Sequence, residues 1–364
     1  MKVGLIAQPW IAVPPHAYGG SEAVIDRLAR GLQAAGHEVV LCASGDSECP
    51  VPRRSPLSEQ RPDQIGQVLP ELYHVLEAYD ALALVGVDVI HDHTLAGAFV
   101  APTGTPVAVT NHGPFDPMLR RLFAAIADRA AVVAISRSQA RAAAPGTIRA
   151  VIHHGLDVED VPVGSGSSDY LLHVGRMTPD KGVLEAIAVA RGAGLPLVIA
   201  GKCREAAEWA FFEELVRPRL GGGIEFVGEV DGPTRNELMS GAMALLNPIQ
   251  WEEPFGLVMI ESLATGTPVV ATCRGAAPEI VDDGITGFLA ETVEDLTAAV
   301  LRAPELDRSA CRRAVEHRFS TARMVDDHLA LYRRLVGTAG GTSFHGRRRG
   351  LLHVGSAGLA APER

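Results

Sequence analysis

The marks of secreted, membrane-spanning or nucleic-acid-binding proteins are missing from this chain of 364 residues. Its five cysteines are odd in number and show no C-x-x-C spacing, which argues against a disulfide framework and a zinc site. The net charge of −10 disfavours attraction to nucleic acid or to an anionic membrane. No apolar run approaches the roughly 18 residues of a membrane span, and the first run is too short for a signal-peptide core. These absences predict a cytoplasmic protein with reduced thiols and no transmembrane segment.

Short apolar runs rich in Val and Ile alternate with amphipathic segments along most of the chain. Such runs are typical of strands buried on both faces, and so of a parallel sheet covered by helices on each side. The first run is not followed by G-x-G-x-x-G, so the dinucleotide fingerprint of a Rossmann oxidoreductase is absent. The strands that we expect lie at 3–7, 39–43, 87–90, 107–110, 132–135 and 150–152, then at 170–174, 195–200, 224–227, 243–247 and 268–271.

The clearest helix is predicted over residues 21–35. Ser21 is placed to cap it, apolar residues follow at helical spacing, and Gly36 ends it. A second amphipathic helix is predicted over 321–336.

The alternation of strands and helices pauses at residues 156–169, where Pro, Gly, Ser and acids follow one another with little periodicity. Such a composition is typical of a flexible linker. We therefore predict an α/β fold of two doubly wound, Rossmann-like domains, 1–160 and 161–320, facing each other across a cleft. The carboxyl ends of the strands would border this cleft, which is the default ligand site. Residues 338–364 are rich in Gly, Ser and Ala around three arginines and are expected to form a disordered tail.

Two acids eight residues apart, Glu253 and Glu261, stand out in the second half. Glu253 precedes a Pro-Phe-Gly turn, and Glu261 lies within the apolar helix that follows. The backbone N–H groups of residues 256–258 would begin that helix and suit a phosphate, while Glu261 could accept hydrogen bonds from ribose hydroxyls. The alternative is that both acids are ordinary solvated side chains, one of them helping to cap the helix.

The segment 251–261 resembles the E-x7-E signature of the retaining family-4 glycosyltransferases, which have the GT-B fold. Four other segments are similar to motifs of that family, and together they extend the resemblance over about residues 1–335. They are the G-R-x-x-x-x-K-G loop at 173–182, the G-x-P-E-I-V-x-D-G-x-T-G-F-L stretch at 275–289, the Gly-Gly loop at 18–22, and the N-G-x-D turn at 152–157, where His154 replaces the usual Asn.

The resemblance implies that the helix at 321–337 crosses back to pack on the first domain. It also implies transfer of a sugar from a nucleoside-diphosphate sugar of the UDP or GDP type. No cofactor and no essential metal are expected, because the family stabilises the departing diphosphate without one and this chain has no D-x-D motif. Arg176 and Lys181 would supply the positive charge. The Gly19–Gly20 bend would bring backbone N–H groups to the same phosphates.

The other roles follow from the resemblance by position. Glu253 would contact hydroxyls of the donor sugar, Glu261 the ribose, and Val230 the base. The donor contacts come from both halves, so donor binding is expected to favour a closed cleft. The predicted donor-binding residues are Gly19, Gly20, Arg176, Lys181, Val230, Glu253, Phe255, Gly256, Leu257, Val258 and Glu261.

Histidines cluster after two expected strands of the first half. His112 matches the position where the family places a histidine beside the transferred sugar. His91 and His93 lie on one side of an extended segment and could hold a metal; the favoured alternative gives His93 an acceptor-side or structural role. The predicted catalytic residues are His112, Arg176, Lys181 and Glu253.

We therefore predict a retaining, metal-independent glycosyltransferase of carbohydrate biosynthesis that acts on an acceptor hydroxyl. The alternatives are a phosphorylase or a sugar-nucleotide epimerase of the same fold and, from another class, a non-catalytic nucleotide-binding module. A lipid, a glycan or a secondary metabolite would each fit as acceptor, because the loops that would bind it vary freely within such families. The basic stretch at 117–150 is expected to be a solvated face, with peripheral membrane contact as the alternative. Abundant Ala, Arg and Gly indicate a GC-rich bacterial genome, such as that of an actinomycete.

Overall fold

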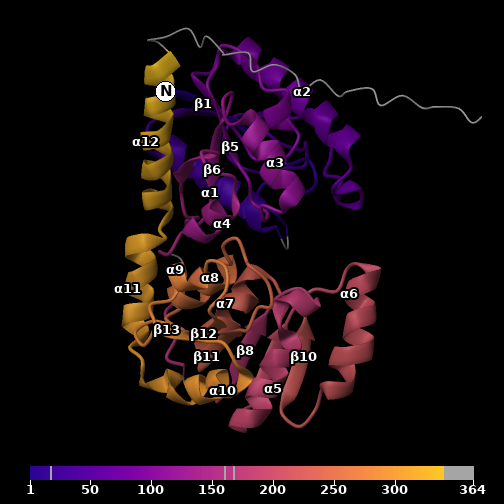
Figure 1. The fold of residues 1–364 in the computed structure, drawn as a ribbon, viewed down its shortest axis with the longest axis vertical. Helices are drawn as coiled ribbons and strands as arrows, with labels where there is room; N and C mark the ends of the chain where they lie inside the picture. The colour runs from indigo at the N-terminus through magenta and orange to yellow at the C-terminus, as the bar shows by residue number, and fades with distance from the viewer. Residues whose placement is uncertain (17–18, 160, 167–168, 340–364) are drawn as a thin grey trace, which may run out of the picture.

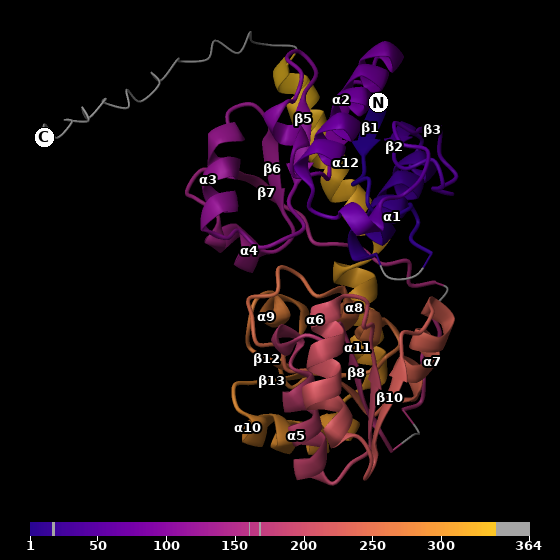
Figure 2. The same ribbon diagram turned by 90° about the vertical axis from the view of Figure 1, so that its right-hand side faces the viewer.

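The computed structural model describes residues 1–16, 19–159, 161–166 and 169–339. It shows two α/β lobes stacked along the long axis of the molecule (Figures 1 and 2). The first lobe contains a seven-stranded sheet in the order β3-β2-β1-β4-β5-β6-β7, and the second a six-stranded sheet in the order β10-β9-β8-β11-β12-β13. All neighbouring strands are parallel. The predicted fold class, two Rossmann-like sheets facing each other, is confirmed.

The strands lie within a few residues of their expected positions, with two additions. The two-residue β3 is too short to give an apolar run, and β13 begins with a glycine after a polar turn, so its apolar run is short. The strands are β1 Lys2–Ile6, β2 Glu38–Cys42, β3 Arg53–Arg54, β4 Val89–Asp92, β5 Val107–Thr110, β6 Ala131–Ala134, β7 Ile148–Val151, β8 Leu171–Val174, β9 Leu197–Ala200, β10 Ile224–Gly228, β11 Ala244–Asn247, β12 Val269–Thr272 and β13 Gly287–Ala290.

Helices connect the strands and cover both sheets. In the first lobe they are α1 Gly20–Ala34, η1 Pro62–Gln64, α2 Val68–Val85, η2 Gly97–Phe99, α3 Pro117–Ile126 and α4 Arg137–Ala142. In the second lobe they are η3 Pro179–Lys181, α5 Val183–Ala193, α6 Ala206–Phe211, η4 Phe212–Val216, η5 Arg217–Arg219, α7 Gly232–Gly241, α8 Leu257–Ala264, α9 Ala277–Ile280, α10 Val293–Arg302, η6 Ala303–Glu305 and α11 Arg308–Arg318. The last helix is α12 Thr321–Ala339.

The two faces of the first sheet are buried against different helices, because successive side chains of a strand point to opposite sides. Val3 and Leu5 of β1 pack in one cluster with α1 and α12. Ile6 of the same strand packs in another cluster with α2 and α3. Burial on both faces explains why the strands are continuous apolar runs rather than alternating ones.

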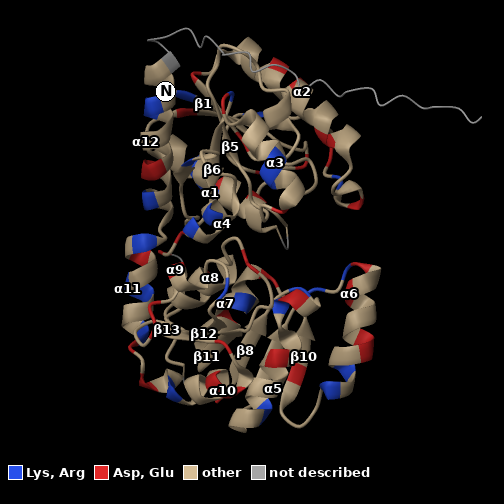
Figure 3. Ribbon diagram, in the orientation of Figure 1, with Lys and Arg blue, Asp and Glu red and all other residues tan. Residues whose placement is uncertain are grey.

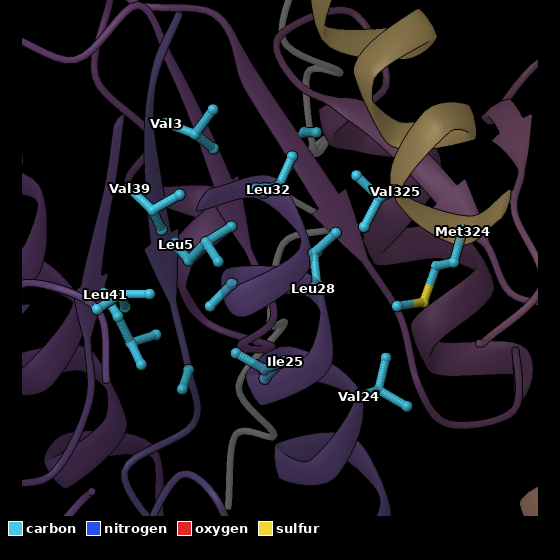
Figure 4. Packing of buried hydrophobic residues seen from close by; sticks show 14 of the residues in the cluster. Val3, Leu5, Val24, Ile25, Leu28, Leu32, Val39, Leu41, Met324 and Val325 are labelled. Carbon is cyan, nitrogen blue, oxygen red and sulfur yellow. The ribbon is translucent and has the colours of Figure 1, made fainter. Parts of the chain in front are cut away.

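The last helix, α12, packs on the first lobe after the chain has left the second through α11 (Figure 1). Met324 and Val325 of α12 lie in the same core cluster as Leu28 and Leu32 of α1 (Figure 4). All four side chains are at most 3% exposed. Burial of each contributes about 1.5–3 kcal/mol, so α12 fastens the end of the second lobe to the first. The expected tail falls almost wholly on residues 340–364, outside the described part of the chain.

The segment expected to be a flexible linker is bound to both lobes: Asp157 pairs with Arg30 of α1 (2.9 Å), and later residues are held by α11 of the second lobe. Arg312 of α11 donates hydrogen bonds to the carbonyls of Val158 (2.5 Å) and Val161 (2.7 Å). Arg308 donates to the carbonyl of Gly164 (2.8 Å). The prediction of a loose linker is wrong for these residues, because arginines from a distant helix bind its backbone carbonyls.

Two surface features bear on membranes. None of the helices in the described ranges is both long enough and apolar enough to cross a lipid bilayer. The arginines of the basic stretch at 117–150 have exposed side chains, as a solvated face would. They are Arg120, Arg121, Arg129, Arg137, Arg141 and Arg149.

Candidate active site

A cleft of about 760 Å³ lies between the lobes and is lined by both. Its size is in the range of small-molecule sites, roughly 300–1,000 Å³. It lies at the carboxyl ends of β1 and β5 on one side and of β8 to β11 on the other. The strand order reverses at β1/β4 and at β8/β11, and such reversals are where open α/β sheets bind ligands. All twelve predicted site residues line this one cleft.

Two helices begin at the cleft without a side-chain cap. Gly19 is the N-cap of α1 and Gly256 that of α8, and neither end has a side-chain capping hydrogen bond. The expected cap by Ser21 is wrong, because Ser21 lies inside the first helical turn. Gly256 adopts a φ of 88°, a left-handed conformation that glycine tolerates. Apart from the Glu22 N–H, which bonds to the Glu22 carboxyl, the first N–H groups at both helix starts have no side-chain cap at the N-cap position, and such groups can bind an anion.

The two helix starts lie close together across the cleft. A Cβ placed on Gly20 would lie 3.1 Å from Cδ1 of Leu257. Any side chain at position 20 would thus press on the first residue of α8. This contact brings two N–H-rich helix ends, one from each lobe, to one point.

Lys181, Trp251 and Glu253 form a closed group of three side chains on the second-lobe wall of the cleft. The Lys181 ammonium forms an ion pair with the Glu253 carboxylate, and the Trp251 indole Nε1–H donates a hydrogen bond to Glu253 Oε2 (2.9 Å). The same ammonium lies 5.2 Å from the centroid of the Trp251 ring. The Lys181 and Glu253 side chains are 17% and 15% exposed. The predicted diphosphate cation and the predicted sugar-binding acid therefore neutralise each other here.

Arg176 follows β8 and is more loosely held. Its guanidinium lies 3.9 Å from Asp180 and 4.0 Å from the buried Glu208. Both separations exceed a hydrogen bond, and about a third of the side chain is exposed. Lys202, after β9, also lines the cleft, and burial lowers the pKa of its ammonium. Basic and acidic residues thus both line the cleft, and blue and red segments of the ribbon occur in both lobes (Figure 3).

Glu261 also lines the cleft and interacts with arginines from both lobes. Arg235 of α7 forms an ion pair with it at 3.1 Å. Burial lowers the pKa of the Arg27 guanidinium on α1, and the charge of Glu261 opposes that shift. Neither arginine belongs to a motif of the second-half signature, so the sequence offered no signal for them. Val230 lies nearby in the loop between β10 and α7.

His112 joins a row of buried histidines at the first-lobe wall. His93 Nδ1 lies 2.9 Å from His112 Nε2, and the His112 ring stacks on His154 at 5.3 Å. Burial, and to a smaller degree the charge of His328, lowers the pKa of His112 to about 4. His112 is therefore neutral at pH 7 and can exchange hydrogen bonds without carrying charge.

The metal alternative for His91 and His93 finds no support in the geometry. His91 Nδ1 lies 2.6 Å from the Tyr332 hydroxyl, and Nε2 lies 2.7 Å from Oγ1 of Thr110. Both of its ring nitrogens are therefore engaged in hydrogen bonds. Within the described ranges, no group of three or more His, Cys, Asp or Glu side chains is arranged to hold a metal. Metal independence itself stays a prediction.

Phe255 and Glu22 are both almost completely buried, which their sequence motifs did not predict. Phe255 is 3% exposed, and its ring packs against His154 (5.0 Å) and Phe319 (6.0 Å), where α8 meets the end of α11. Glu22, in the first turn of α1, is 3% exposed, and burial raises the pKa of its carboxyl to about 7. The sequence signal for Glu22 was an acid two residues after Gly20, at the start of a helix with an apolar face.

Comparisons with known proteins agree over most of the chain. The family model described as "Glycosyltransferase Family 4" matches residues 18–160, and "Glycosyl transferases group 1" matches residues 168–305. A phosphatidyl-myo-inositol mannosyltransferase of Mycolicibacterium smegmatis is 26% identical over 85% of this chain and 86% of its own length.

Solved structures show the same similarity. AviGT4, a glycosyltransferase involved in avilamycin A biosynthesis, is 29% identical with a TM-score of 0.70, over 93% of this chain and 98% of its own. HepE of Anabaena, solved with UDP-glucose, is 19% identical with a TM-score of 0.72, over 92% of this chain and 100% of its own, and so shares the fold.

Proposed function

The chain is a glycosyltransferase with a Glycosyltransferase Family 4 domain followed by a Glycosyl transferases group 1 domain, and from this premise we propose that it is a retaining enzyme that moves a sugar from a nucleoside diphosphate to an acceptor hydroxyl. One observation carries the proposal. One cleft is lined by two helix starts without an N-cap side chain, two cations, Arg176 and Lys181, and two acids, Glu253 and Glu261. Cations and helix starts suit a diphosphate, and carboxylates suit the hydroxyls of a sugar and a ribose.

In the proposed reaction, the bond between the anomeric carbon and the diphosphate oxygen breaks while a bond to the acceptor oxygen forms on the same face. The acceptor proton passes to an oxygen of the departing diphosphate, so the configuration is kept. Negative charge grows on the leaving group, and Arg176, Lys181 and the N–H groups of α1 and α8 would stabilise it. A hydrogen bond to a charged group contributes about 1.5–3 kcal/mol, and more where it is fixed toward the charge of the transition state.

The remaining residues would bind and orient the donor. Glu253 would accept hydrogen bonds from sugar hydroxyls and Glu261 from the ribose, with Val230 beside the base. His112, which is neutral, would contact the transferred sugar from the first lobe. We propose no essential metal, because the cations and helix starts supply positive charge without one.

A UDP- or GDP-sugar is the proposed donor. HepE was solved with UDP-glucose, and the mycobacterial relative is named for mannosyl transfer to a phosphatidylinositol. We propose a lipid, glycan or secondary-metabolite hydroxyl as the acceptor and the cytoplasm as the place of action.

A thermal-shift panel of UDP-, GDP- and ADP-sugars tests this function and identifies the donor. A ligand at 100 times its dissociation constant stabilises the native state by about 2.7 kcal/mol, so the correct donor should raise Tm clearly. Glu261→Gln should lose most of that rise, whereas Glu77→Gln, an exposed change on α2, should keep it. No response to any nucleotide sugar, with the protein folded, would reject the proposal.

Product analysis separates the alternatives within the fold. A phosphorylase would release sugar 1-phosphate only when inorganic phosphate is present, and an epimerase would convert the donor with no acceptor. A retaining transferase would give a glycoside with the same anomeric configuration as the donor, read from the one-bond carbon–proton coupling at the anomeric carbon. A product with the opposite anomeric configuration would refute the retaining assignment.

A further inference from the structure

Trp251 lies beside both members of the Lys181–Glu253 ion pair, the two charged side chains proposed to bind the diphosphate and the sugar. Its indole N–H donates to Glu253 (2.9 Å), and its ring faces the Lys181 ammonium at 5.2 Å. One side chain thus contacts both members of an ion pair through two different parts of its ring system. The motif that flagged Glu253 assigned no role to this tryptophan.

The backbone fixes Trp251 in this place. The adjacent Gln250 N–H donates to the carbonyl of Asp180 (2.8 Å), which ties the loop after β11 to the loop that carries Lys181. The Glu253 N–H donates to the Trp251 carbonyl (3.0 Å), and the Glu253 carbonyl accepts from Ala276 (3.0 Å). The loop is therefore anchored on both sides of the indole.

A bound donor would compete with both members of this ion pair. The diphosphate would attract the Lys181 ammonium, and the sugar hydroxyls would compete for the Glu253 carboxylate. A largely buried carboxylate that loses its cation costs free energy unless other donors satisfy it. The indole N–H keeps one oxygen of Glu253 satisfied, and the ring face keeps a cation-attracting surface beside Lys181.

We propose that Trp251 is a positioning residue of the donor site, whose N–H holds Glu253 for the sugar and whose ring face holds Lys181 for the diphosphate. The assignment rests on the proposed function, because it gives these two partners their separate tasks. One side chain thus positions both Glu253 and Lys181. Because it contacts them through different parts of the indole, different substitutions can remove one contact or both.

Two variants separate the N–H from the ring. Trp251→Phe keeps an aromatic face and removes the N–H, so affinity for the nucleoside diphosphate alone should stay within about threefold of wild type. Its kcat/KM with the nucleotide sugar should fall about 10- to 100-fold, the effect of losing a hydrogen bond to a charged group. Trp251→Leu removes both parts and should also weaken binding of the nucleoside diphosphate, by about 3- to 20-fold.

Trp209→Phe is the matched control. Trp209 lies on α6 with 46% of its surface exposed and is not among the residues that line the cleft. This variant should keep the nucleoside diphosphate affinity and kcat/KM of the wild type. The nucleotide used, UDP or GDP, is the one that stabilises the wild-type protein.

A measurement without ligand tests the contact itself. The chain has three tryptophans, so nitrogen-15 labelling of tryptophan gives three indole N–H signals in an NMR spectrum. Glu253→Gln should shift the signal that Trp251→Phe removes and leave the other two in place. Equal shifts of all three, or none, would show that the indole does not bond to Glu253 and would overturn the assignment.

The outcomes separate the two proposals. A lower kcat/KM with unchanged nucleoside diphosphate affinity in Trp251→Phe, and a loss of both in Trp251→Leu, supports the positioning role. If both variants behave like Trp209→Phe, or if Trp251→Phe loses as much nucleotide affinity as Trp251→Leu, the role is refuted while the transferase assignment stands. If the wild-type protein binds neither a nucleoside diphosphate nor any nucleotide sugar, the proposed function fails and the role of Trp251 fails with it.

Discussion

Replacing the buried Glu22 by glutamine should make the protein more stable at alkaline pH and leave it nearly unchanged in acid. Glu22 is 3% exposed at the mouth of the cleft, and burial raises the pKa of its carboxyl from 4.5 to about 7. Below pH 4.5 the carboxyl is neutral in both the native and the unfolded state. Between pH 4.5 and 7 the unfolded chain ionises first, so the free energy of unfolding falls as pH rises. Well above pH 7 the carboxyl is ionised in both states, and the decrease in the free energy of unfolding no longer changes with pH.

The shift sets the size of the effect. A difference of about 2.5 pKa units, at 1.36 kcal/mol each, gives about 3 kcal/mol at pH 8. At pH 5 the same two values give under about 1 kcal/mol. Glutamine has nearly the shape of a neutral glutamic acid and carries no charge at any pH, so Glu22→Gln should recover these amounts.

Urea denaturation at pH 5, 6, 7 and 8, followed by fluorescence, measures the difference between wild type and variant. Because each comparison is made at one pH, other titrating groups, including the buried histidines, cancel. Glu77→Gln, on the exposed side of α2, is the control and should stay within about 0.5 kcal/mol of wild type throughout. Curves for wild type and Glu22→Gln that run parallel from pH 5 to pH 8 would refute the argument that burial holds this carboxyl neutral.

Three further predictions concern the donor site. Lys181→Ala and Arg176→Ala should each lower kcat/KM by at least about 100-fold, which is the effect of losing one transition-state donor. The circular dichroism spectrum should stay unchanged. A variant whose kcat/KM is within threefold of wild type would show that the residue does not bind the diphosphate. Activity should survive exhaustive treatment with EDTA, and a complete loss restored by manganese or magnesium would reject metal independence. Gly20→Val should lower turnover more than nucleotide affinity, because the Cβ of valine would lie about 3.1 Å from Leu257 of the opposite lobe. Calorimetry measures the affinity, and steady-state rates measure the turnover. Unchanged turnover would show that close approach of the two helix starts is not required.

The distribution of apolar residues along the sequence was enough to predict the two parallel sheets. Runs such as 3–7 and 107–110 are apolar without alternation because helices cover both faces of each strand, so a parallel sheet could be expected from composition and period alone. The reversal of strand order at β1/β4 and at β8/β11 follows from the rules for parallel sheets. That reversal brings the ends of distant strands to one cleft.

Three predictions failed where the sequence of a segment did not determine its structure: a strand was missed, a helix cap was misplaced and a bound segment was taken for a loose linker. β3 has two residues and no periodicity to detect. Ser21 had the right chemistry for a cap, but the helix starts one residue earlier, at Gly20. The segment 156–166 has a linker's composition, yet Arg308 and Arg312 bind its carbonyls. Composition reports what a segment prefers when it is isolated, and here a distant helix supplied the missing partners.

The sequence by itself determined the sheet-forming segments, the family motifs and the candidate chemistry of Lys181, Glu253 and Glu261. Only the tertiary structure decided which partners those residues have. Arg27 comes to Glu261 because α1 and α8 begin at facing edges of two lobes. Trp251 reaches Lys181 because the loops after β8 and β11 are neighbours at a strand reversal. Periodicity and composition describe one segment at a time, whereas charge pairing, burial and pKa depend on segments that meet only when both lobes have packed.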